Sequence, residues 1–278
     1  LPQSFEECLR DYELERFKIK VSNHLEKDIK RLMEIAAIIH ESGTRNFGFT
    51  LDGNEQFETL EDFRKFWHQL EKTVSLKNFL EHLIFVEQPV KRNNALTEDT
   101  KMTFEDWKDR PLIIIDESDG EIGDLQKALQ CGYNGTSHKN CKGIIKGITN
   151  ACLLEYYKST KPQENFVLSG EDLANIGPVA LLQDIAVANV LGITHMERNG
   201  HHYFKGLSMF SWEIQKGIVQ HHGDLYHDND KGYATLNIQK GKISLKSIKN
   251  APFGLGIPLD AKQYTYVKDW HFNSLYKV

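Results

Sequence analysis

The feature that most constrains the fold of this chain is a unit that recurs along it, a short β-rich run followed by a stretch with helical periodicity. Seven such runs can be read, at residues 16–21, 46–51, 83–87, 112–116, 135–139, 165–169 and 193–197. Between them, apolar residues recur at three- and four-residue spacing, as in residues 25–42, 60–70 and 179–191. This spacing is typical of amphipathic helices.

Strands that alternate with helices indicate βαβ units and a parallel sheet. Seven units within about 180 residues favour a closed (β/α) barrel of the TIM type over an open, doubly wound sheet. No GxGxxG or P-loop follows any of the runs, which disfavours the usual nucleotide-binding folds. We therefore predict an α/β barrel over residues 1–220. Residues 221–278, rich in Gly, His, Asp and aromatic residues, are expected to form a tail packed over it.

Composition limits which binding partners and which cellular location the sequence favours. The formal net charge of −5 offers no basic surplus to meet phosphates, which argues against nucleic acid as a partner. No apolar run approaches the roughly 18 residues needed to span a bilayer, so no membrane segment is expected. The four cysteines form no CxxC pair, which indicates reduced thiols. A soluble, cytoplasmic protein is predicted, and a homo-oligomer stays open.

Three successive runs end in a carboxylate, namely Asp52, Glu87 and Asp116. In a parallel barrel, the side chains at the C-terminal ends of the strands point into the active site. Three carboxylates held that close repel one another unless a cation lies among them. Oxygen ligands with room left for water and substrate suit Mg²⁺. Singly, Asp52 before Gly-Asn suggests a turn and Asp116 a helix cap, but three in register favour a metal site.

Lysines flank this acidic series. Lys18 and Lys20 lie two residues apart in the first run, so both face the same side of a strand. The fifth run ends in Lys139. Two neighbouring ammonium groups destabilise each other's charge, which lowers a lysine pKa towards that of a usable base. An isolated KxK is more often a solvated strand face, but here it directly precedes the acidic series.

The ordered motifs resemble the barrel domain of the enolase superfamily, muconate lactonizing enzyme-like subgroup. They are KIK at 18–20, LDGN at 51–54, VEQP at 86–89, IDES at 115–118 and SHKNCKGI at 137–144. The order and spacing agree with that family to about residue 148. The resemblance also implies an N-terminal α+β capping domain and a first barrel strand before the KxK run, and neither is in this sequence. We therefore expect the barrel to be incomplete here.

The resemblance implies a role for each matching residue. Asp52, Glu87 and Asp116 would ligate an essential Mg²⁺. Lys20 would be one acid/base, with Lys18 tuning its pKa, and Lys139 would be the acid/base on the opposite face of the substrate. Lys142 competes with Lys139, which we prefer because it lies at the strand end.

The family reaction removes the proton next to a carboxylate, and the metal stabilises the resulting enediolate. The resemblance therefore implies a small carboxylate substrate and a racemase, epimerase, cycloisomerase or dehydratase. Glu197 lies where the family often contacts substrate, and Glu171 follows the preceding run. Arg198, with His201 and His202, is a candidate anion-binding group or part of a polar loop network.

Two other functions stay open at this stage. Lys139 would be a Schiff-base lysine in an aldolase-like enzyme, although three metal-ligand candidates disfavour that chemistry. Alternatively, the chain is a non-catalytic, metal-stabilised scaffold. The acid-sugar dehydratases of the superfamily usually carry a His–Asp dyad in place of the late lysine, so Lys139 favours the muconate lactonizing type.

Overall fold

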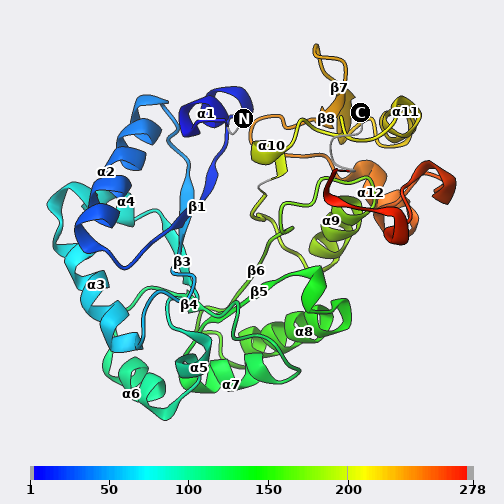
Figure 1. Cartoon of the computed structure of the whole chain (residues 1–278). Helices are drawn as coiled ribbons and strands as arrows, with labels where there is room; N and C mark the ends of the chain where they lie inside the picture. Colours follow the sequence, from blue (N-terminus) through cyan, green and yellow to red (C-terminus); the bar gives the residue numbers. More distant parts are fainter. Residues whose placement is uncertain (1–2, 199, 274–278) are drawn as a thin grey trace. The chain divides into compact units, whose positions relative to one another are not determined.

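The computed structural model describes residues 3–198 and 200–273. The chain divides into two compact units (Figure 1). The first, which we call the strand–helix unit, comprises Glu6–Glu171 and His195–Glu197. The second, the C-terminal unit, comprises Leu1–Phe5, Asp172–Thr194 and Arg198–Val278. The division falls between residues 171 and 172, whereas the sequence predicted the end of the barrel at residue 220.

The strand–helix unit alternates strands with helices, as the sequence predicted. Its strands are β1 (Arg16–Lys20), β2 (Gly48–Asp52), β3 (Leu83–Glu87), β4 (Ile113–Ile114), β5 (Gly135–His138) and β6 (Val167–Gly170). Its helices are α1 (Phe5–Tyr12, entering from the other unit), α2 (Leu25–Glu41), α3 (Leu60–Lys72), α4 (Lys77–Leu80), α5 (Arg92–Ala95), α6 (Glu98–Asp106), α7 (Asp124–Cys131) and α8 (Ile144–Thr160). In Figure 1, α2, α3, α7 and α8 lie along the outer side of the strands.

The strands of this unit are parallel and neighbour one another in chain order. Among the described residues, β1 to β4 form one four-stranded sheet, and β5 pairs with β6. An isolated parallel bridge between Ile115 and Thr136 joins the two sheets. In the part of the chain that is described, β1 has β2 as its one ladder partner. The parallel α/β fold is thus confirmed. The ladders of the described residues form a row of strands in chain order, and the closure of this row into a barrel stays a prediction.

The pattern of buried residues follows the two periodicities of the sequence, which are two residues in the strands and three to four residues in the helices. On β1, Phe17 and Ile19 are buried, whereas Lys18 and Lys20 alternate with them and face the other side of the strand. All five residues of β2 are buried, as expected of a strand covered on both faces. Helix α3 begins at a Thr59 cap whose hydroxyl accepts a bond from the Asp62 amide at 3.1 Å. It buries the stripe of Leu60, Phe63, Phe66, Trp67 and Leu70.

Two predicted strands differ from the structure. The run at 112–116 forms a ladder only over Ile113–Ile114, since the Ile115 amide bonds instead to the carbonyl of Gly135 on β5, at 3.0 Å. The run at 193–197 forms no strand; a single bridge joins Glu197 to Glu171. The amide of Ile193 bonds to the carbonyl of Ala188 at the end of a helix, so the first residue of the predicted strand cannot begin a ladder.

The C-terminal unit contains α9 (Ala180–Val190), which the sequence predicted over residues 179–191, and further regular structure in the later residues, where the sequence showed no pattern. Its other elements are α10 (Gly200–Tyr203), α11 (Trp212–His221), β7 (Tyr226–Asp228), β8 (Ala234–Leu236) and α12 (Lys246–Asn250). Strands β7 and β8 pair antiparallel as a hairpin. Gly254 packs so closely on α9 that an added Cβ would lie 2.4 Å from the carbonyl oxygen of Leu182. No helix within the described residues is long and apolar enough to cross a membrane.

Candidate active site

The three predicted metal ligands lie at the C-terminal ends of neighbouring strands. Asp52 ends β2, Glu87 ends β3, and Asp116 follows β4 by two residues. Each is at most 2% exposed. Removing a carboxylate from water costs several kcal/mol unless a charge partner and hydrogen bonds compensate it. Three such groups on adjacent strands therefore require cations close by.

Lys18 supplies the central cation. Its ammonium lies 3.0 Å from Asp52 Oδ2 and 3.0 Å from Glu87 Oε2. The same nitrogen lies 2.6 Å from Glu197 Oε2 and 3.6 Å from Glu171 Oε2. One buried ammonium thus contacts four carboxylates, which come from two strand ends and from the bridge between residues 171 and 197.

The other lysines of the site contact the acids from two sides. On β1, the Lys20 ammonium lies 2.5 Å from Asp52 Oδ2, and its side chain is 47% exposed. After β5, Lys139 donates to Asp116 Oδ2 at 2.8 Å and also contacts Glu171. Lys142 donates to Asp116 Oδ1 at 2.6 Å. Both competitors for the late acid/base role therefore bind the same carboxylate.

These residues form what we call the acid–lysine cluster. Within the described part of the strand–helix unit it comprises five carboxylates and four lysines: Asp52, Glu87, Asp116, Glu171, Glu197, Lys18, Lys20, Lys139 and Lys142. Their approach across strands that are far apart in the sequence follows from the parallel fold, which brings the carboxyl ends of the strands to one edge.

Burial and charge shift the pKa values in different directions. Burial raises the pKa of Glu87 to about 8, although Lys18 acts against it. Burial also raises the pKa of Glu171 to about 7, and a hydrogen bond with Glu197 adds to the effect. Burial opposes the ionisation of Asp116, but Lys142 and Lys139 outweigh it and lower its pKa.

The ammonium groups of the KxK pair were predicted to destabilise each other, with Lys18 lowering the pKa of Lys20. The pKa of Lys18 itself shifts in the opposite direction. Burial acts to lower the Lys18 pKa, but the carboxylates of Glu87 and Asp52 outweigh it, so the pKa is raised. The sequence argument considered only the repulsion between two ammonium groups. It missed the acids from other parts of the fold, three of which lie within 3.0 Å of the Lys18 ammonium and outnumber the neighbouring lysine.

The donor set suits a divalent cation, but the acids do not share one point. Lys18 already places a cation between Asp52 and Glu87, and carboxylate oxygens are the ligands that Mg²⁺ prefers. Asp116 instead bonds to Lys139 and Lys142. Over residues 3–198 and 200–273, no three His, Cys, Asp or Glu side chains are arranged to hold a metal ion. Asp52 and Glu87 thus share Lys18, whereas Asp116 contacts Lys139 and Lys142 and still acts electrostatically on Glu87. The predicted role of the three acids as metal ligands stays a prediction.

A buried network behind Asp116 escaped the sequence analysis. Asp119, 2% exposed, accepts hydrogen bonds from Thr136, Asn150 and Lys146 at 2.9–3.1 Å. Lys146 is itself buried and lies four residues after Lys142, in the first turn of α8. An Asp three residues after Asp116, together with two lysines four apart, was the pattern that could have indicated this network.

Arg198, predicted to contact substrate, belongs to the C-terminal unit. There its Nη2 lies 3.3 Å from Asp172 Oδ2. The side chains of His201 and His202 lie outside the described residues. The predicted roles of these three residues in substrate binding stay predictions.

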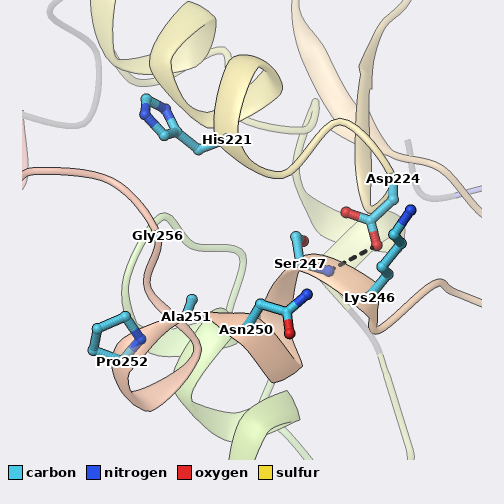
Figure 2. Close-up of a pocket in the computed structure, with 8 residues that line it drawn as sticks. All are labelled: His221, Asp224, Lys246, Ser247, Asn250, Ala251, Pro252 and Gly256. Atoms are coloured by element: carbon cyan, nitrogen blue, oxygen red, sulfur yellow. Dashed lines mark hydrogen bonds between the residues drawn. The ribbon is translucent and has the colours of Figure 1, made fainter.

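The C-terminal unit also contains an open pocket of about 520 Å³. Figure 2 shows His221 and Lys246 on opposite sides of it, with the Asp224 carboxylate accepting a hydrogen bond from the Ser247 amide, at 3.2 Å. Asp224 also accepts from the Ser244 hydroxyl. The Asp224 carboxylate therefore stabilises the loop before α12 and the start of this helix, and the polar groups that line the pocket do not converge on one point.

Comparison with solved structures defines the class of fold. No protein-family model and no curated protein matches the chain. A putative mandelate racemase from Bordetella bronchiseptica, complexed with 2-oxoglutarate/phosphate, has a TM-score of 0.56 at 12% identity, over 92% of this chain and 57% of that one. An N-succinyl Arg/Lys racemase from Bacillus cereus has a TM-score of 0.52 at 15% identity, over 88% and 57%.

A third similar structure is an enolase from Bradyrhizobium complexed with magnesium and mandelic acid, with a TM-score of 0.51 at 12% identity, over 88% and 56%. By their names, these structures include two racemases and an enolase. The parallel α/β fold of this chain is similar to the fold of these structures. The chain spans 50–57% of the length of such structures.

Proposed function

We propose that this chain forms the catalytic part of a Mg²⁺-dependent enzyme that removes the proton next to a carboxylate. The observation that carries the proposal is the acid–lysine cluster, in which acids from neighbouring strand ends lie between lysines from β1 and from the end of β5. The similar solved structures support an isomerase or lyase of this kind. The reaction would be a racemisation, epimerisation, cycloisomerisation or dehydration.

In this proposal Asp52, Glu87 and Asp116 would hold the metal. Bound Mg²⁺ would stabilise the negative charge that develops on the substrate carboxylate when the proton leaves. Lys20 and Lys139 would transfer the proton, each on its own side, because they approach the acids from different strands. Lys18 would hold Asp52 and Glu87 together from its buried position.

The two acids outside the proposed metal set, Glu171 and Glu197, indicate which class of substrate would fit the site. Glu171 and Glu197 lie within the cluster but outside the proposed metal set. Two carboxylates that would bind no metal favour a small carboxylate substrate that also carries hydrogen-bond donors or a positive charge. Dipeptides and amino-acid derivatives fit this description better than simple dicarboxylates, because a second anionic group would meet Glu171 and Glu197.

The test has two arms. Titration calorimetry with Mg²⁺ alone measures whether the chain binds the metal, and binding with 1:1 stoichiometry is expected. Incubation with Mg²⁺ in D₂O and panels of dipeptides, N-acyl amino acids and acid sugars then tests for deuterium at the carbon next to the carboxylate. A chain that binds no Mg²⁺ at millimolar concentration would contradict the proposal.

One observation favours a second candidate, a non-catalytic metal-binding scaffold. The lysines already neutralise most of the acids, and within the described residues no three-ligand set is preformed. Such a scaffold would be stabilised by Mg²⁺ but would exchange no proton of any substrate in D₂O. Metal binding with no exchange, measured on a protein that includes the capping domain implied by the motifs, would favour this candidate.

A further inference from the structure

Gln88 is the residue of the VEQP motif whose chemistry the proposed function does not use. It follows Glu87 directly and is fully buried. Its side-chain oxygen accepts hydrogen bonds from the amides of Asp116 and Ser118, at 2.7 Å and 3.1 Å. Its side-chain nitrogen donates to the Val90 carbonyl at 2.7 Å and to the Ser118 hydroxyl at 2.8 Å.

These four bonds use the full capacity of the amide, which has two donor hydrogens and two acceptor lone pairs. The backbone conformation of Gln88 adds to this observation. Its φ is +34°, a left-handed conformation that is sterically unfavourable for a residue with a Cβ. Glycine would fit that backbone with less strain but could make none of the side-chain bonds. The geometry therefore indicates that the position requires a side chain, and in particular a primary amide.

The place of Gln88 in the sheet explains what the amide does. The ladder between β3 and β4 pairs Val86 with Ile113 and Glu87 with Ile114, and it ends there. The last backbone bond runs from the Gln88 amide to the Ile114 carbonyl, at 2.9 Å. Beyond it the chain turns towards β5, so no strand partner remains for the Asp116 amide. The Gln88 side chain supplies that partner and continues the connection between β3 and the segment after β4.

This connection fixes Asp116 from its backbone side. Lys139 and Lys142 hold the carboxylate oxygens of Asp116, but long lysine side chains define an orientation only loosely. Gln88 is covalently joined to Glu87 and hydrogen-bonded to the Asp116 amide. The distance between two of the proposed ligands thus depends on a short, fully buried link.

We propose that Gln88 is a positioning residue that sets the Asp116 carboxylate relative to Glu87 for a divalent cation. The identity of the cation as Mg²⁺ rests on the proposed function. The coupling between Gln88 and the Asp116 backbone does not depend on the metal, so the two can be tested separately.

The main experiment uses Gln88→Met in the full chain, because methionine keeps the length and loses all four bonds. Amide hydrogen exchange, followed by NMR without metal, should be faster at Asp116 and Ser118 than in the wild type. The dissociation constant for Mg²⁺ alone, from calorimetry, should rise roughly 10- to 100-fold, the range seen when groups that orient metal ligands are removed.

Gln215 offers a matched control. It is also buried and bridges backbone groups, donating to the Phe210 carbonyl at 2.8 Å and accepting from the Ala234 amide at 2.9 Å. It lies in the C-terminal unit. Gln215→Met should lower the melting temperature without changing the Mg²⁺ dissociation constant. Equal dissociation constants for Gln88→Met, Gln215→Met and the wild type would overturn the positioning role.

A second variant covers a failure of Gln88→Met to fold. In Gln88→Glu an oxygen remains to accept from both amides, so Asp116 and Ser118 should keep slow exchange; fast exchange there would overturn the proposal. A wild-type chain that binds no Mg²⁺ would refute the proposed function alone. In that case slow exchange in the wild type and in Gln88→Glu would still support the coupling.

Discussion

Lys20 and Asp52 are register partners across the parallel strands β1 and β2, and the Lys20 ammonium lies 2.5 Å from Oδ2 of Asp52. The second lysine of the KxK motif thus meets the first acid of the series directly across the sheet. Lys18, two residues earlier on the same face, reaches the same oxygen at 3.0 Å. A single carboxylate oxygen therefore joins both lysines of the motif, and replacing any of the three should affect the others.

Glu87→Gln should remove Mg²⁺-dependent stabilisation. A ligand at 100 times its dissociation constant stabilises the folded state by about 2.7 kcal/mol, so the wild-type melting temperature should rise with Mg²⁺. The amide of the variant cannot replace a charged ligand. Glu105→Gln, at an exposed position on α6, is the control. A melting temperature that rises equally in both variants would place the metal elsewhere.

Lys20→Ala and Lys139→Ala should separate the two proton-transfer roles. In a racemase, each variant should lose exchange of the α-proton for one enantiomer and keep it for the other, as measured in D₂O. In an elimination or cycloisomerisation, one variant should lose all exchange. The other should lose transition-state stabilisation of about 3 kcal/mol. Lys108→Ala, at an exposed position, is the control. Wild-type exchange in both variants would rule out both lysines as bases.

Lys146→Met should destabilise the strand–helix unit by about 3–5 kcal/mol, because it leaves the buried Asp119 carboxylate without its cation. Urea unfolding measures the loss, and adding Asp119→Asn should restore part of it. Lys127→Met removes an exposed pair with Asp124, 2.9 Å apart, and should cost less than about 1 kcal/mol. Equal losses for the two lysines would show that the Asp119 network contributes no more than a surface pair.

Gly53→Ala should disturb the close packing between the residues that follow β2 and those that follow β3. An added Cβ would lie 2.5 Å from the Cα of Pro89, and the Gly53 amide donates to the Glu87 carbonyl at 2.9 Å. The backbone must shift, which costs about 1–3 kcal/mol. Gly217→Ala in α11, with nothing within 4 Å of the new Cβ, should instead stabilise by up to about 1 kcal/mol. Melting temperatures that change in the same direction would contradict this account.

Asp224 should contribute an acid-sensitive part of the stability of the C-terminal unit. Burial opposes its ionisation, but hydrogen bonds from Ser244 and Ser247 outweigh it and lower its pKa to about 2, from an ordinary value of 3.8. A carboxyl whose folded pKa is depressed stabilises the protein above the ordinary pKa, and this contribution is lost as the pH falls towards the folded pKa. The melting-temperature difference between wild type and Asp224→Asn should therefore shrink between pH 5 and pH 2. A constant difference would show that the charge contributes nothing.

The series of carboxylates and the alternation of strands with helices could be predicted from the sequence, because each depends on a local pattern of residues. Leu83–Glu87 forms the predicted strand, and Asp52 and Glu87 end their strands as predicted. The alternation of Phe17 and Ile19 with Lys18 and Lys20 placed both lysines on one face, since side chains of a strand alternate with a period of two. These features need no knowledge of the neighbouring strands.

The charge state of the acid–lysine cluster could not be predicted from the sequence in the same way. The repulsion between Lys18 and Lys20 was predicted to lower a lysine pKa, yet the pKa of Lys18 is raised by Glu87 and Asp52 from other strands. The missing strand at 193–197 has a similar cause, because the end of α9 takes the Ile193 amide. Electrostatic and hydrogen-bond competition depends on distances between residues far apart in the chain, and no local pattern contains them.

The sequence by itself determined the alternating parallel architecture and the positions of Asp52, Glu87, Asp116, Lys20 and Lys139 at or just after the ends of their strands. Periodicity and chain order specify these through short-range geometry. Only the tertiary structure decided which lysine meets which acid, that Asp116 lies with Lys139 and Lys142, and that Gln88 replaces a missing ladder partner. Those pairings follow from strand register and from where each ladder stops, which are set by packing across the whole unit.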